Sequence, residues 1–182
     1  MIIMLKILKQ LFEEKKRASF YTDFENGNRF NYGTVIKADE DYSVLQLISP
    51  DGDDDGIFCI ETQRIYKVEL QGLYEKKMAA LCEGKVYPEY KLTFGDDGIK
   101  NAVLSFAKKD GQIVSIELSN SECDDAVGFV ESFDEEICCI KAVDEYGIDD
   151  GISYVNYEDI TRIVLMSSDE KRLMWLWRYN QQ

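Results

Sequence analysis

The segment that decides the fold occurs twice, as GTVIKADE at residues 33–40 and as GFVESFDE at residues 128–135. Both copies lie within a longer repeat, because residues 32–81 align without a gap with residues 127–176 at a constant offset of 95. Fourteen of the fifty aligned pairs are identical, whereas average composition gives about three by chance. Duplication of one structural unit explains this excess.

The repeated block predicts four short strands followed by a helix. Its apolar residues form short runs that are separated by Asp and Gly, which favour the tight turns between strands. In copy one, strands are predicted over 33–38, 42–49, 56–61 and 64–70, and a helix from about Leu73. Copy two repeats this order.

A helix and a further strand are predicted upstream of each block. In copy two a helical apolar stripe follows Asp97, a predicted N-cap, and precedes a strand over 114–118. The stripe consists of Ile99, Ala102, Val103, Phe106 and Ala107. Copy one offers a helix over about 4–16 and a strand over 20–24. We expect the first helix to pack over the strands, although its basic flanks also fit a membrane surface.

Each copy therefore predicts a helix, five short strands and a second helix. Closure into a small barrel best accommodates five short antiparallel strands with one apolar face, because it hides the strand edges. The predicted fold class is mainly β with α+β elements, in two tandem five-stranded barrels. The predicted domains are residues 1–83 and 97–182, joined by a connector over 84–96.

A Gly-x-Val-x-x-x-Asp motif resembles the first motif of the Sm and Sm-like proteins. It consists of Gly33, Val35 and Asp39 in copy one and of Gly128, Val130 and Asp134 in copy two. The resemblance implies SH3-like barrels. The family's base-binding Asn is replaced by Ser43 and Cys138, and its Arg-Gly pair has no counterpart in residues 60–62 or 155–157. The repeated Asp-Gly segments also resemble those of a group of uncharacterised bacterial proteins.

The charge and the cysteines limit the classes of function. The 21 Lys and Arg against 35 Asp and Glu give a formal net charge of −14, which opposes nucleic acid and anionic lipid as partners. No apolar run is long enough to span a bilayer. The five cysteines lack the spacing of a disulfide framework or a zinc site, so we expect reduced thiols and a cytoplasmic location.

The absence of histidine argues against an enzyme. The chain has no histidine, so Ser-His-Asp and Cys-His catalytic arrangements and imidazole metal ligands are excluded. We predict no catalytic residue, no cofactor and no metal site. The acidic loop over 51–56 resembles the first half of a calcium loop, but Thr62 occupies the twelfth position and Ile148 replaces Asp53 in copy two. A solvated hairpin loop is the alternative that we favour.

Four repeated aspartates are candidate contact points for a partner. They are Asp54 and Asp55 in copy one and Asp149 and Asp150 in copy two. Turn chemistry is the alternative explanation, because Asp and Gly favour tight connections between strands.

The last predicted helix carries more apolar surface than one helical stripe requires. It begins at a predicted capping box formed by Ser167 and Glu170. Trp175 and Trp177 follow in copy two only, and they are candidate contacts within the chain or with a partner, because tryptophan is favoured at interfaces.

These observations predict a non-enzymatic cytoplasmic module for protein binding or scaffolding. Its partner is expected to be another protein or a second copy of the chain, and the sequence identifies no small-molecule ligand. RNA binding by analogy with Sm proteins is the alternative.

The charge yields a prediction about RNA. We expect no binding of single-stranded RNA at micromolar concentration in physiological salt, because the net charge repels phosphate and the base-binding positions are absent. Fluorescence anisotropy with labelled oligonucleotides measures this directly. Salt-sensitive binding at micromolar concentration or tighter would contradict it.

Overall fold

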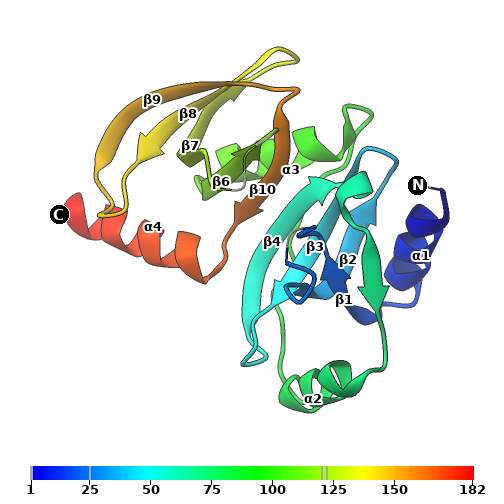
Figure 1. Cartoon of the computed structure of the whole chain (residues 1–182). Coiled ribbons are helices and arrows are strands. Elements are labelled where there is room, and N and C mark those ends of the chain that lie inside the picture. The colour runs from blue at the N-terminus through cyan, green and yellow to red at the C-terminus, as the bar shows by residue number, and fades with distance from the viewer. Residues whose placement is uncertain (1, 25, 120, 122) are drawn as a thin grey trace. The chain divides into compact units, whose positions relative to one another are not determined.

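The computed structural model describes residues 2–24, 26–119, 121 and 123–182. The chain forms two units, Met1–Tyr90 and Lys91–Gln182 (Figure 1). The division falls inside the predicted connector over 84–96. Each unit is described below by itself.

Both units contain the predicted helix, five strands and second helix. Unit 1 consists of α1 (Ile2–Glu13), β1 (Arg17–Tyr21), β2 (Asn31–Ala38), β3 (Tyr42–Ile48), β4 (Asp54–Glu61), the 3-10 helix η1 (Thr62–Arg64), β5 (Lys67–Glu69) and α2 (Leu73–Leu81). Unit 2 consists of α3 (Gly98–Lys109), β6 (Ile113–Leu118), β7 (Ala126–Phe133), β8 (Ile137–Val143), β9 (Asp149–Asn156), β10 (Ile160–Leu165) and α4 (Ser168–Asn180). The prediction of a mainly β chain with helices is confirmed.

The duplication is confirmed at the level of the strands. The bounds of β2, β3 and β4 differ from those of β7, β8 and β9 by the same 95 residues that relate the two sequences. The bounds of α1 and α3 differ by 96 residues instead, and so do the first residues of β1 and β6. Unit 2 has one residue fewer than unit 1 between the starts of its first and second strands, which hides the start of the repeat from a comparison at fixed offset.

The prediction of closed SH3-like or Sm-like barrels is wrong. Within unit 1 the antiparallel strands pair in the order β5-β1-β2-β3-β4, and within unit 2 in the order β10-β6-β7-β8-β9. In the described part of the chain, no ladder joins β4 to β5 or β9 to β10. The strands at the two ends of each order therefore do not close the sheet.

The turn after the fourth strand of each unit is bonded to the loop between the second and third strands. The amide of Thr62 donates to the carbonyl of Asp41 at 2.8 Å, and the amide of Tyr157 donates to that of Glu136 at 2.9 Å. The turn is thus held by the hairpin between the second and third strands. It directs the chain to the first strand, with which β5 and β10 pair.

Gly33 and Gly128 allow the second strand of each unit to lie against the third. A Cβ atom at Gly33 would lie 2.0 Å from the carbonyl oxygen of Gln46, and one at Gly128 would lie 2.0 Å from that of Lys141. The register shifts a few residues further along both strand pairs, as at a β-bulge. These glycines are the repeated residues of the Gly-x-Val motif, and the close approach explains why no side chain is present.

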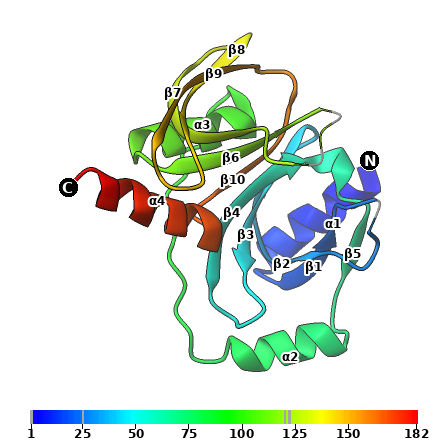
Figure 2. The same cartoon turned by 60° about the vertical axis from the view of Figure 1, so that its left-hand side comes forward.

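The helices cover the sheets through their apolar residues. Leu5, Leu8 and Leu11 of α1 are buried, and α1 packs against β2 as expected. In unit 2, α3 packs against β7 and α4 against β6 (Figure 2). Asp97 precedes α3, but its side chain does not form the predicted cap. None of the helices in the described ranges has the length and apolar character needed to cross a membrane.

The glycine contacts generate a stability prediction. Gly33→Ala and Gly128→Ala should each destabilise the chain by about 2 kcal/mol or more, because the added methyl group meets a backbone carbonyl that cannot rotate away. Urea unfolding measures the loss. Gly95→Ala is the matched control, since a Cβ there meets open space. Equal stability of Gly128→Ala and the control would contradict the explanation.

Candidate functional site

The candidate site lies beneath α4, whose first turn is set by the predicted capping box. The Ser167 side chain accepts from the amide of Asp169 at 3.2 Å, and Glu170 Oε2 accepts from the amide of Ser167 at 3.1 Å. The prediction of a capping box is confirmed. The capping box provides hydrogen-bond partners for amide groups at the helix N-terminus that have none within the helix.

A buried hydrogen bond joins this helix to the first strand of its unit. Ser115 Oγ of β6 donates to Glu170 Oε1 at 2.6 Å, and both side chains are buried. Unit 1 contains the same bond, from Ser19 of β1 to Glu75 of α2. The sequence repeat included the two glutamates, but the serines are 96 residues apart and were missed at the offset of 95.

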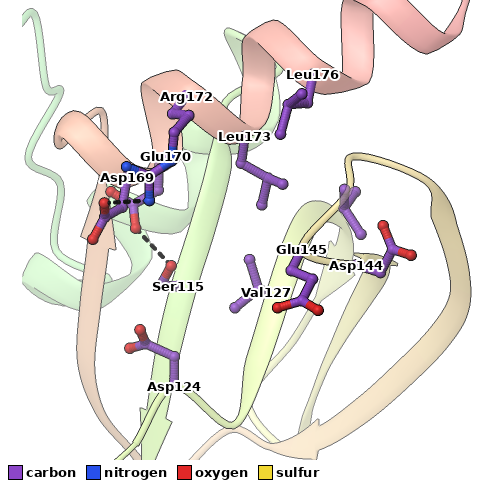
Figure 3. A pocket seen from close by; sticks show the side chains of 11 residues that line it. Ser115, Asp124, Val127, Asp144, Glu145, Asp169, Glu170, Arg172, Leu173 and Leu176 are labelled. Atoms are coloured by element: carbon purple, nitrogen blue, oxygen red, sulfur yellow. Dashed lines mark hydrogen bonds and ion pairs between the residues drawn. The ribbon is translucent and has the colours of Figure 1, made fainter.

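A cavity of about 290 Å³ opens beside this bond, between α4, the start of β7 and the loop from β8 to β9 (Figure 3). The apolar side chains around it come from two strands and from α4. They are Val127, Val143, Leu173 and Leu176. The charged side chains around it are Asp124, Asp144, Glu145, Asp169, Glu170 and Arg172. This cavity is called the α4 cleft below.

The α4 cleft is electronegative, because five carboxylates and one guanidinium line it. Arg172 pairs with Asp169 at 2.8 Å, and Arg162 pairs with Asp124 at 2.8 Å. Asp144 Oδ1 accepts from the amides of Tyr146 and Ile148, which orders the loop that carries Glu145. The excess of carboxylates over cations favours a positively charged ligand.

The α4 cleft combines apolar and acidic side chains. Its apolar residues suit an aliphatic stem, and its carboxylates suit a cationic end. Among the described residues, no cluster of three or more Cys, Asp or Glu side chains has the arrangement of a metal site. Ser115, the hydroxyl in the cleft, donates to Glu170 within the capping network and thus holds the helix.

The four aspartates predicted as partner contacts lie outside the α4 cleft. Asp54 accepts from Gln46 at 2.8 Å and from the Tyr90 hydroxyl at 2.6 Å. Burial, together with that bond to Asp54, raises the pKa of Tyr90. Asp55 follows in β4 and is half-buried. The structure thus places Asp54 against residues of its own unit.

The copy-two pair is more exposed. Asp149 accepts from the amide of Gly151 at 3.0 Å and pairs with Lys141 at 3.2 Å. The backbone hydrogen bond and then the bond to Lys141 lower the pKa of Asp149. Asp150 is exposed in β9. The two copies therefore place the equivalent aspartates in different environments.

The two tryptophans of α4 have different surroundings. Trp177 is half-buried and lies against Phe129, with ring centroids 5.2 Å apart. Trp175 is 63% exposed and stacks on Tyr179, which is 62% exposed, at 5.5 Å between centroids. The expectation of packing within the chain is thus met by Trp177, whereas Trp175 and Tyr179 form an exposed aromatic pair.

The acidic loop of copy one contacts the chain that follows α2. Lys85 Nζ donates to the carbonyl of Asp51 at 2.9 Å and pairs with Asp53 at 2.6 Å. The Tyr87 hydroxyl donates to the carbonyl of Gly52 at 2.7 Å. The acidic segment is thus a hairpin loop, and Lys85 and Tyr87 of the predicted connector contact it.

The motif aspartates and the adjacent cysteines occupy structural positions. Asp39 Oδ1 accepts from the amides of Asp41 and Tyr42, and Asp134 makes the equivalent bonds in copy two. These backbone bonds lower the pKa of Asp134. Burial raises the pKa of Cys138 to about 11, so its thiol stays protonated and unreactive at neutral pH.

Comparison of the chain with protein-family models, with curated proteins and with solved structures found no match. The site is therefore interpreted from its own residues. Sequence reasoning found α4 and its capping box, but it did not identify the α4 cleft. The cleft joins residues from β7, the β8–β9 loop and α4, which no local sequence pattern connects.

The buried bond in the site generates a second stability prediction. Ser115→Ala should cost about 1–3 kcal/mol, because the buried Glu170 carboxylate loses a donor. Urea unfolding followed by tryptophan fluorescence reports on both stability and α4. Ser105→Ala, at an exposed position in α3, is the matched control. A loss no larger than that of the control would show that the bond contributes little.

Proposed function

We propose that this protein is a non-enzymatic protein-binding module whose α4 cleft receives a lysine or arginine side chain of its partner. The observation that carries this proposal is the composition of the cleft, with apolar residues beside five carboxylates. Lysine and arginine combine an aliphatic stem with a cationic end, so both parts of such a side chain find a matching surface.

The size of the cleft supports a side chain as the occupant. Its volume of about 290 Å³ lies at the lower end of the roughly 300–1,000 Å³ typical of small-molecule sites. A single side chain of a docked segment fits this space, and the rest of the segment would contact the surrounding surface.

The charges of the cleft and of the chain support a basic protein over RNA. The carboxylates of Asp144 and Glu145 line the cleft, so they would repel a phosphate group bound there. The net charge of −14 attracts a basic partner at long range and raises its rate of association.

The exposed aromatic pair on α4 supplies a second contact surface. Trp175 and Tyr179 are stacked, so little side-chain freedom remains to be lost on binding. Tryptophan and tyrosine are enriched among the residues that contribute most to protein interfaces. Arg172, which lines the cleft, lies one helical turn before Trp175 on α4.

A peptide experiment tests the proposal. A fluorescein-labelled peptide of alternating lysine and leucine should bind the full chain, and the same peptide with glutamate in place of lysine should not. Binding should weaken as salt rises from about 50 to about 500 mM, because opposite charges attract. Fluorescence anisotropy measures both. Equal binding of the two peptides would overturn the proposal.

A charge reversal locates the binding. Glu145→Lys should raise the dissociation constant of the lysine peptide about fivefold to tenfold, because an attraction at the cleft becomes a repulsion. Glu83→Lys makes the same change of net charge at an exposed position in unit 1 and is the matched control. Equal weakening by both variants would show that the peptide responds only to net charge.

A further inference from the structure

β9 is an exposed strand at the end of the unit 2 sheet. It pairs with β8 along one edge, and it is the last strand in the order (Figure 1). Its side chains are exposed except those of Ser153, which is half-buried, and Val155, which is buried. Ile152 is 60% exposed and Tyr154 is 68% exposed, and both lie on the face opposite to Val155.

The part of β9 from Gly151 to Asn156 has no charged residue and no proline. Lysine, proline, other charges and β-bulges prevent edge-to-edge pairing in many sheets, and in β9 the charges and the register shift are confined to its first residues.

We infer that β9 pairs antiparallel with β9 of a second copy of this chain, with the two-fold axis at Ser153. The strand sequence is complementary to itself in this register. Ile152 of each copy then faces Tyr154 of the other, and β-branched residues opposite aromatic residues stabilise antiparallel pairs. The contact is isologous and closes as a dimer.

The same register also places the charges favourably. The charged residues of β9 are Asp149 and Asp150, and both precede Gly151, where φ is +85° and the ladder with β8 shifts register. They therefore lie outside the regular pairs around Ser153. Asp149 pairs with Lys141 of its own β8.

The salt dependence distinguishes this dimer from peptide binding in the α4 cleft. Each chain carries a net charge of −14, so two copies repel at long range and added salt should strengthen their association. Binding of a basic peptide should weaken under the same change. The two proposals can therefore fail independently.

Sedimentation equilibrium of the full chain tests the inference. From about 1 to about 500 μM, the wild-type chain should pass from monomer to dimer. Ile152→Lys and Tyr154→Glu should each weaken the dimer at least about tenfold while leaving the circular dichroism spectrum unchanged, because both positions are exposed in the monomer. Leu73→Lys, at an 88% exposed position in unit 1, is the control and should not weaken it.

Mixing the two variants tests the register. One Ile152→Lys chain and one Tyr154→Glu chain would form a heterodimer with one Lys–Glu pair and one unchanged Ile–Tyr pair, so the mixture should dimerise more strongly than either variant alone. A mixture that stays as monomeric as its components would overturn the register. A wild-type chain that remains monomeric throughout, or that assembles beyond a dimer, would overturn the inference.

Discussion

The buried carboxylate at the third position of the last helix is the interaction on which each unit depends. Glu75 and Glu170 each lie below the surface and accept from a serine of the first strand. A carboxylate is costly to bury without donors, so the helix must begin where the serine can reach it. This requirement connects the two ends of each unit and positions α4 beside the cleft.

A second interaction common to both units holds the turn after the fourth strand. The amides of Thr62 and Tyr157 are held by the hairpin between the second and third strands, which separates the fourth strand from the fifth. A closed barrel would cover both edges, whereas β9 has no strand at its outer edge among the residues that the structure describes. The association that we infer for β9 depends on this open edge.

The sequence was sufficient to predict the strands and the capping box, because both depend on residues close together in the chain. The repeat predicted β2 to β4 and β7 to β9 within a few residues. The prediction of a closed barrel was wrong, because the pairing of distant strands, such as β10 with β6, is not encoded in the local alternation of apolar and polar residues. The α4 cleft was missed for the same reason, because Val127 and Leu173 come together only in the folded unit.

The two copies share their framework residues and differ at the residues of the proposed binding surfaces. The glycines at the close strand contacts and the glutamates of the last helices are identical in both copies. In contrast, Met78 of α2 is fully buried where α4 has Leu173 at the cleft, and Ala80 of α2 corresponds to the exposed Trp175. A residue that maintains the fold is needed in both copies, whereas a residue that contacts a partner is needed in only one. Both proposed surfaces, the α4 cleft and β9, lie in unit 2.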